Sequence, residues 1–177
     1  NKDLGYEKDQ LLVVRNTYLL ENNEDNFIQE IKNDPRVASV THSAFVPAGE
    51  SDNEVGGIFQ NGEFLRRMYF YNVDENYIPT LGMKLLQGRN FSDEFGNESN
   101  KVIINEKAAE ILGFAKDAVG KTFQRDTNEG PQDITVIGVI KNFNWKSLYQ
   151  KIEPLILKKN PYGGIIIRSK TANMSGI

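Results

Sequence analysis

The amino-acid sequence predicts an α+β fold in which short strands and short helices occur in about equal measure. The first observation is a strand, helix, strand order between residues 10 and 45. The second is a pair of strand patterns, Thr122–Gln124 and Ile134–Val139, on either side of a turn-forming segment at residues 126–131. The third is that all elements are short, without an internal repeat or a low-complexity segment. Mixed short elements of this kind are typical of α+β domains.

The first unit begins with a buried strand at Gln10–Arg15, a continuous aliphatic run between polar ends. A helix is predicted to start near Asn23 or Asn26. Its packing face is formed by Phe27, Ile28 and Ile31. The helix should end before Pro35, because the residue before a proline is disfavoured in the helical region. Val37–Phe45 then forms a second strand, which gives the outline of a split βαβ unit.

The middle of the chain is expected to hold a loop, a strand and a short helix. Val46–Gly62 is rich in glycine and predicts a long loop with room for one short strand. The aromatic-rich Phe64–Val73 predicts a strand. Asp74 is expected to cap a short helix that ends at Gly82. Pro79 lies late in this helix, so only one or two turns are expected.

The second half is expected to contain one more helix among several strands. Lys101–Ile104 has a strand pattern, and Asn105 is suited to cap the helix that follows. The packing face of that helix is formed by Ala108, Ile111 and Leu112. Gly113 is expected to end it. The last two strands are predicted at Leu155–Lys158 and Gly164–Arg168.

Length and charge exclude some classes of protein. The 177 residues fit one domain or two small lobes, and a chain of this size buries roughly 70% of its unfolded surface. The 21 basic and 24 acidic residues are interspersed and give a net charge of −3. The mean hydropathy is −0.48. Since no basic stripe is present, the sequence does not favour binding to nucleic acid or to an anionic membrane surface.

Several kinds of site are also excluded by composition. The sequence has no cysteine, which excludes disulfides, thiolate metal sites and cysteine nucleophiles. His42 is the only histidine, so a histidine-based metal cluster is excluded, and a solvent-facing place on a strand is expected for it. The longest aliphatic runs are much shorter than the roughly 20 residues of a spanning helix. The polar start of the chain does not resemble a signal peptide.

Two short patterns suggest chemistry and fail on spacing. Gly120–Thr122 reads Gly-Lys-Thr, but a phosphate-binding loop needs a glycine where this chain has Ala115. A glycine turn into a strand is the better interpretation. Asp93, Glu94 and Glu98 do not reproduce the ligand spacing of a calcium-binding loop, so a solvated loop is preferred. We therefore expect no catalytic residues, no metal and no cofactor.

Two aromatic groups could contact a ligand or a partner. The first could line a ligand pocket, although alternation along a half-buried strand also explains it; its members are Tyr69, Phe70, Tyr71 and Tyr77. The second consists of Phe143, Trp145 and Leu148. A role in the core or between lobes is favoured for the second group, and if exposed it would be a candidate partner contact.

The segment Gly88–Pro154 carries a recognisable series of short phrases, each a glycine turn or an aliphatic strand. In order they are Gly88–Ser92, Val102–Ala109, Leu112–Phe114, Val119–Lys121, Val136–Phe143, Ser147–Leu148 and Ile152–Pro154. Together they resemble the MacB-like periplasmic core domain, the part of FtsX/MacB-type ABC transporter permeases that lies outside the membrane. The likeness extends over nearly the whole chain, and Asn1–Tyr6 is similar to the segment that leaves the first transmembrane helix.

The resemblance implies a fold of two lobes. Residues 1–88 and 150–177 would form a discontinuous, porter-like lobe built from βαβ-type units. Residues 89–149 would form a smaller α+β lobe inserted into it. Such domains typically continue through a further helix and strand. The porter-like lobe is therefore either incomplete in this chain or completed by residues after Ile177.

The resemblance also implies a non-catalytic function on the periplasmic side of the bacterial inner membrane. The domain would couple ATP-driven movement of the membrane helices to a substrate or an adaptor, in efflux, lipoprotein release or envelope processes. Its partners would be a cytoplasmic ATPase, a second permease copy, and a periplasmic adaptor or substrate. The alternative is a free-standing periplasmic small-molecule-binding or sensor domain, with a pocket formed by Val46–Gly62 and the aromatic residues of Tyr69–Tyr77.

Overall fold

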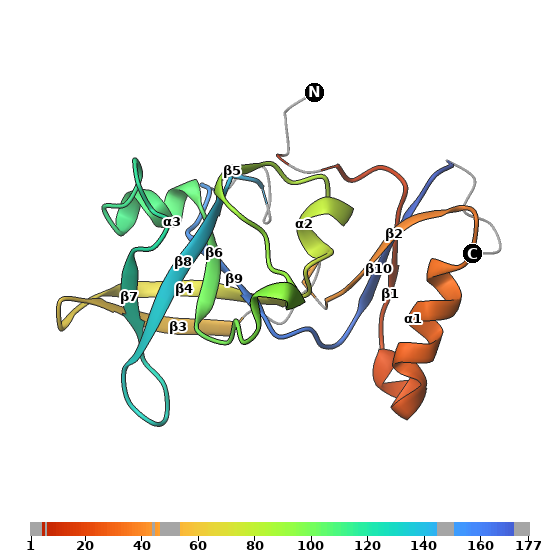
Figure 1. Cartoon of the computed structure of the whole chain (residues 1–177), viewed down its shortest axis with the longest axis horizontal. Coiled ribbons are helices and arrows are strands. Elements are labelled where there is room, and N and C mark those ends of the chain that lie inside the picture. The colour runs from red at the N-terminus through yellow and green to blue at the C-terminus, as the bar shows by residue number, and fades with distance from the viewer. Residues whose placement is uncertain (1–4, 6, 44, 47–53, 145–150, 172–177) are drawn as a thin grey trace.

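The computed structural model describes residues 5, 7–43, 45–46, 54–144 and 151–171, which form two sheets (Figure 1). The smaller sheet has three antiparallel strands in the order β1-β10-β2. Their bounds are β1 Leu11–Val14, β10 Ile165–Ser169 and β2 Val37–His42. A 3₁₀ segment, η1 (Thr17–Asn23), leads from β1 into α1 (Glu24–Lys32), which lies against the outer face of this sheet (Figure 1). The predicted strand, helix, strand unit is therefore confirmed.

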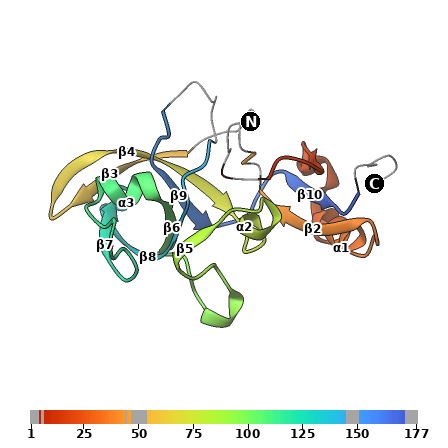
Figure 2. The same cartoon turned by 90° about the horizontal axis from the view of Figure 1, so that it is seen from above.

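The larger sheet has seven strands in the order β5-β8-β6-β9-β4-β3-β7. Because β7 pairs with β8 as well as with β3, the strands from β8 to β7 form a closed ring, and β5 pairs with β8 outside it. The bounds are β3 Glu54–Gln60, β4 Glu63–Val73, β5 Leu85–Gly88, β6 Lys101–Asn105, β7 Thr122–Arg125, β8 Gln132–Ile140 and β9 Leu155–Lys159. Figure 2 shows this ring at the opposite end of the molecule from the smaller sheet and α1.

Three short helices accompany the larger sheet. α3 (Glu106–Ile111) follows β6, and α2 (Tyr77–Thr80) lies between the two sheets (Figure 1). A 3₁₀ turn, η2 (Asp93–Phe95), interrupts the connection from β5 to β6. Strands are more numerous than helices, so the expected equal balance is replaced by a sheet-dominated α+β fold.

Alternate side chains along β4 enter two different cores, as the two-residue period of a strand requires. Met68 and Phe70 belong to a cluster with apolar residues from the other strands of the ring and from α3, so this cluster fills the ring. Tyr71 and Val73 belong to a second cluster, on the outer face of the ring. That second cluster also includes Ile166 of β10, so it joins the larger sheet to the smaller one.

A third cluster lies on the other face of the smaller sheet. It contains Ile165 and Ile167 of β10 together with Ile28 of α1. The smaller sheet is thus covered by α1 on one face and by the shared core on the other. The predicted packing face of the first helix is confirmed, since Phe27 and Ile31 also pack against this cluster.

The strand pairing crosses the expected lobe boundaries at residues 88 and 150. β4 and β9, expected in the porter-like lobe, pair in parallel, and β9 also pairs with β6, expected in the inserted lobe. Hydrogen bonding groups residues 11–42 with 165–169, and residues 54–140 with 155–159, while the lobe boundaries at residues 88 and 150 stay a prediction. The sequence could not indicate this grouping, because it depends on pairing between strands that are distant along the chain.

Candidate functional site

The smaller sheet holds the first and the last strand of the part of the chain that the structure describes. β1 and β10 are antiparallel neighbours, with Leu11 opposite Arg168 and Val14 opposite Ile165. The chain passes to the larger sheet after β2 and returns from it before β10. The described segment before β1 also contacts the residue after α2, because the Glu7 backbone N–H donates to the Leu81 carbonyl oxygen at 2.8 Å. The junction between the two sheets is therefore the candidate functional site.

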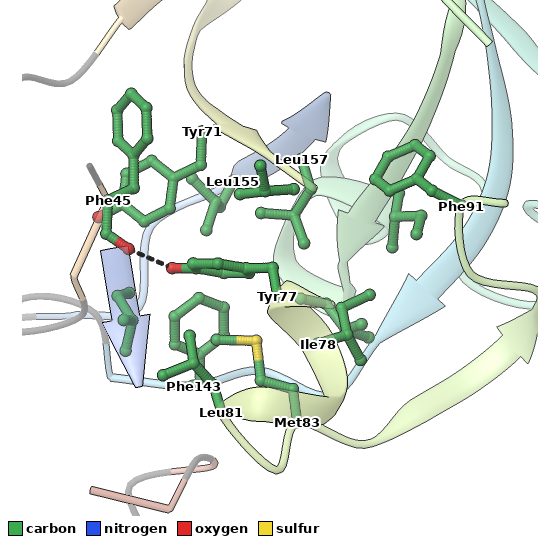
Figure 3. Packing of buried hydrophobic residues seen from close by; sticks show 14 of the residues in the cluster. Phe45, Tyr71, Tyr77, Ile78, Leu81, Met83, Phe91, Phe143, Leu155 and Leu157 are labelled. Atoms are coloured by element: carbon green, nitrogen blue, oxygen red, sulfur yellow. Dashed lines mark hydrogen bonds between the residues drawn. The ribbon is translucent and has the colours of Figure 1, made fainter. Parts of the chain in front are cut away.

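The apolar part of the junction is the core shared by the two sheets (Figure 3). Tyr77 of α2 lies at its centre and is fully buried. Phe45, which follows β2, packs against Tyr71 of β4 with ring centroids 4.6 Å apart and an interplanar angle of 30°. Such aromatic pairs add about 0.5–1.5 kcal/mol beyond the burial of their area. The junction is therefore packed like the interior of a domain.

Hydrogen bonds inside this core fix the path of the chain after β2. The Tyr77 hydroxyl donates to the Phe45 carbonyl oxygen at 2.6 Å, as Figure 3 shows. The Ser43 hydroxyl donates to the Asn72 carbonyl oxygen at 3.0 Å, and it accepts from the Phe45 backbone N–H at 3.1 Å. Because these groups are buried, each bond also prevents the cost of an unpaired polar atom.

Asp74 forms a second connection between the sheets. Its Oδ2 accepts from the His42 backbone N–H at 2.9 Å, and its Oδ1 accepts from the Thr41 hydroxyl. Oδ1 also accepts from the Asn76 backbone N–H at 3.0 Å. The sequence predicts Asp74 as the cap of the short helix, but the residue that precedes the first turn of α2 is Asn76. Asp74 instead ties the end of β4 to β2, while Gly82, at a φ of 61°, follows α2 as expected.

Arg168 of β10 makes a third connection, beside α2. Its Nε donates to the Thr80 carbonyl oxygen at 2.6 Å. Its two terminal nitrogens donate to the Asp9 carbonyl oxygen at 3.1 Å and to the Glu7 carbonyl oxygen at 2.9 Å. One guanidinium group therefore joins the smaller sheet to α2 and to the segment before β1. No local pattern in the sequence could have indicated these long-range partners.

The predicted partner contacts are only partly described by the structure. Phe143 is fully buried in the core that joins the sheets, as the favoured core role predicts, so the exposure that a partner contact would need is not met at this residue. A phenyl ring buried among apolar neighbours is explained by the hydrophobic effect alone. Trp145 and Leu148 lie outside the described residues.

The other aromatic group also belongs to the interior. Tyr71 and Tyr77 are in the core that joins the sheets, and Phe70 is inside the ring. Tyr69 packs, partly buried, against the joining core. Phe70, Tyr71 and Tyr77 therefore cannot line a ligand pocket, because their side chains are packed inside these cores. Residues 47–53 of the expected loop lie outside the described residues, and residues 54–60 form β3.

The glycine turn, the acidic loop and the single histidine singled out in the sequence all have structural roles. Gly120 has a φ of 83° and turns the chain into β7, which confirms a glycine turn. The Glu98 side chain, 1% exposed, lies 2.7 Å from Nη2 of Arg89, so the solvated loop expected there is wrong at this residue. His42 was expected to face solvent. Its side chain is only 17% exposed, with Nε2 3.2 Å from Glu24 Oε1.

Among the described residues, the histidine, aspartate and glutamate side chains do not gather in groups of three that could hold a metal ion. In the same part of the chain, no helix is both long enough and apolar enough to cross a membrane. What the junction does offer is a buried core and three sets of hydrogen bonds between the sheets. This arrangement is suited to holding two bodies together.

Comparisons with known proteins agree with this architecture. A family model described as the MacB-like periplasmic core domain matches residues 3–156. The periplasmic region of MacB from Actinobacillus actinomycetemcomitans is similar in structure, with a TM-score of 0.60 at 17% identity, covering 97% of this chain and 79% of that one. The extracellular domain of the noncanonic ABC-type transporter YknZ from Gram-positive bacteria has a TM-score of 0.58 at 18% identity, covering 92% of this chain and 83% of that one. No curated protein matches the sequence significantly.

Proposed function

The chain belongs to the MacB-like periplasmic core domain family, and from this premise we propose that it is the periplasmic domain of an ABC transporter permease that transmits movement from membrane helices to a substrate or an adaptor. In this proposal the domain carries no catalytic residue of its own. A cytoplasmic ATPase supplies the energy, and a second permease copy completes the transporter. The domain lies on the periplasmic side of the inner membrane. Efflux, lipoprotein release and envelope processes are the settings in which such coupling would serve.

The observation that carries the proposal is the junction between the two sheets. β1 and β10 are the first and the last strand among the described residues, and both belong to the smaller sheet. Asp74 and Arg168 bind that sheet to β4 and α2, and Tyr77 closes the core between them. Because packed cores resist continuous deformation, a displacement of the smaller sheet moves the closed ring with it. The ring is then the part that meets the substrate or the adaptor.

The test uses the complete permease, with its membrane helices and its ATPase partner, in lipid nanodiscs. The chain has no cysteine, so Tyr18→Cys and Phe64→Cys each introduce a single labelling position within it. Tyr18 is 74% exposed beside the smaller sheet, and Phe64 is 58% exposed on the closed ring, so labels at these positions do not disturb a core. Distances between spin labels are measured without nucleotide and with ATP, and ADP serves as the control.

Two distances give separate results. We expect the distance between Phe64→Cys labels on the two permease copies to change when ATP binds. We expect the distance between positions 18 and 64 within one copy, measured after dilution with unlabelled permease, to stay constant. Identical distances between the copies in both nucleotide states would overturn the coupling. A change within one copy would overturn transmission through a rigid junction.

A further inference from the structure

A groove opens in the closed sheet where β3 turns away from β7. The two strands pair only at Ile58 with Arg125 and at Phe59 with Gln124. Beyond Phe59 the chain reverses into β4 through Asn61, at a φ of 54°, and Gly62, at a φ of 80°. Positive φ at two central residues is typical of the tight turns that join antiparallel strands. β7 extends to Thr122, beyond its last pairing with β3 at Gln124. Since β3 has turned away into β4 there, a groove is left between β3 and β7.

The groove has the size of a small-molecule site. Its volume is about 660 Å³, within the roughly 300–1,000 Å³ usual for ligand pockets. It is lined by the turn between β3 and β4, by β7 and the residues just before it, and by Phe114 after α3. Nothing in the junction between the two sheets contributes to it. The inference drawn from this groove is therefore independent of the proposed function.

Two phenyl rings supply the apolar part of the lining. Phe59 and Phe114 are both half-buried, so each presents part of its ring to the groove. Phe59 is held in place by Phe64, whose ring meets it edge to face with centroids 5.4 Å apart and an interplanar angle of 71°. A ring fixed in this way can receive a flat apolar surface without losing side-chain freedom on binding.

Neutral hydrogen-bonding side chains supply most of the polar part of the groove lining. Gln60 donates from Nε2 to the Leu112 carbonyl oxygen at 3.0 Å, and Gln124 donates from Nε2 to Asp133 Oδ1 at 3.1 Å. These bonds fix both amides and leave the amide oxygens as acceptors for a ligand. The Asn61 and Thr122 side chains line the same groove. An apolar ligand would leave these groups without partners, which costs binding energy.

The charges in the groove nearly cancel. Lys121 and Asp133 both line it, and Lys121 Nζ also lies 3.7 Å from Asp117 Oδ2. A strongly anionic or cationic ligand would therefore find no excess of opposite charge. The ligand that fits is neutral, has one flat apolar face for the phenyl rings, and carries hydroxyl or amide groups around its edge.

We propose that the groove between β3, β7 and Phe114 binds a neutral saccharide. A sugar ring presents C–H groups on one face and hydroxyl groups around its rim, and these two features match the phenyl rings and the amides of this lining. An extended uncharged peptide is the competing occupant. Such a peptide would have to bind through backbone groups. β7 pairs with β3 only at Gln124 and Arg125, so the edge of β7 that could receive a peptide is limited to its first two residues, Thr122 and Phe123.

The binding test uses the 177-residue chain with three uncharged probes: chitotetraose, maltotetraose and a tetra-alanine peptide with blocked ends. Amide chemical shifts and titration calorimetry measure binding, and the two sugars distinguish an N-acetylated from a plain glycan. We expect at least one sugar to shift the amides of Asn61, Thr122 and Gln124, and the peptide to leave them unchanged. Binding of neither sugar, or of the peptide alone, would overturn the proposal.

Variants connect the binding to the lining. Phe59→Ala is expected to weaken sugar binding at least tenfold, and Gln124→Ala several-fold. The matched control is Val55→Ala, which removes an exposed apolar side chain at the other end of β3 and should leave affinity unchanged. Because Phe59→Ala could disturb folding, Gln124→Ala provides an independent reading from a side chain at the groove surface. If the folded Gln124→Ala and Phe59→Ala proteins both bound the sugar with unchanged affinity, the assignment of the groove would be wrong.

Discussion

Arg125 lies across the ring of Phe70, with its guanidinium carbon 4.2 Å from the ring centroid. The same guanidinium group pairs with Glu54 of β3, whose other carboxylate oxygen accepts from Asn72 Nδ2 at 3.1 Å. These contacts bridge β7, β3 and β4 where the closed sheet has its shortest pairing. A cation over an aromatic face contributes about 0.5–2 kcal/mol, depending on desolvation. Burial lowers the pKa of Arg125, but the group stays charged at neutral pH.

Gly56 makes this arrangement possible, and Gly56→Ala is expected to destabilise the protein. A Cβ atom at this position would lie 2.9 Å from Phe70 Cε2 and 3.2 Å from Arg125 Nε. Overpacking of this kind costs about 1–3 kcal/mol. Gly57→Ala is the matched control, because its Cβ would meet no atom closer than 3.5 Å. Urea unfolding should show a lower midpoint for Gly56→Ala only, and equal midpoints for the two variants would contradict the steric argument.

Asn105 joins β6 to α3 and to the segment that leads into β9, so its replacement by alanine is expected to destabilise the closed ring. Its Oδ1 accepts from the backbone N–H groups of Ala108 at 2.9 Å and of Leu155 at 3.0 Å. Its Nδ2 donates to the Glu153 carbonyl oxygen at 2.9 Å. Loss of a helix cap costs about 0.5–2 kcal/mol, and each orphaned buried group about 1–3 kcal/mol. We therefore expect Asn105→Ala to destabilise the protein by about 2–4 kcal/mol in urea unfolding.

A second cap provides the comparison for that variant. Ser92 caps η2 by accepting from the Glu94 backbone N–H at 3.2 Å, and this bond is exposed to solvent. Ser92→Ala should cost no more than about 1 kcal/mol, because water can replace the lost acceptor. Asn105→Asp should also destabilise the protein, because it sets an oxygen against the Glu153 carbonyl oxygen and buries a charge. If Asn105→Ala proved as mild as Ser92→Ala, the role of Asn105 in joining α3 to β9 would be wrong.

Tyr77→Phe tests the hydrogen bond at the centre of the junction. The change keeps the ring in the core and removes the hydroxyl that donates to the Phe45 carbonyl oxygen. The carbonyl then remains buried without this donor, at a cost of about 1–3 kcal/mol. Thermal unfolding should show a lower Tm for Tyr77→Phe and no change for Tyr18→Phe, whose ring is 74% exposed. A Tm equal to that of the parent protein would mean that the bond does not stabilise the junction.

The sequence was informative where the physical cause is local. Asn105 was predicted as a cap because a side chain that accepts from a backbone N–H three residues later needs no distant partner. The glycine turn at Gly120 and the end of α2 at Gly82 were predicted for the same reason, since each depends on the φ of one residue. The family resemblance was also correct, because it rested on the order of such local phrases.

The features that the sequence could not indicate depend on contacts between distant segments. Asp74 has the same local appearance as a helix cap, and only the position of β2 shows that it accepts from Thr41 and His42. Arg168 binds a carbonyl oxygen 88 residues earlier, and a strand pattern gives no information on such a partner. The closed ring requires β7 to pair with both β3 and β8, and register between strands is set by the complete fold.

The turn between α1 and β2 gives a prediction about acid. Arg36 donates to Asp34 from Nε at 2.9 Å and from its backbone N–H at 2.9 Å, and these bonds lower the pKa of Asp34 from 3.8 to about 2. Since the folded pKa is the lower one, the stabilisation is complete above pH 3.8 and is lost as the pH falls through about 2.

Asp34→Asn should therefore unfold at a lower urea concentration than the parent at pH 6, with the difference disappearing near pH 2. Asp126→Asn is the control: this exposed carboxylate lies just after β7, and its replacement should leave the midpoint unchanged. A carboxyl carbon of Asp34 that titrates near pH 3.8 would exclude this mechanism.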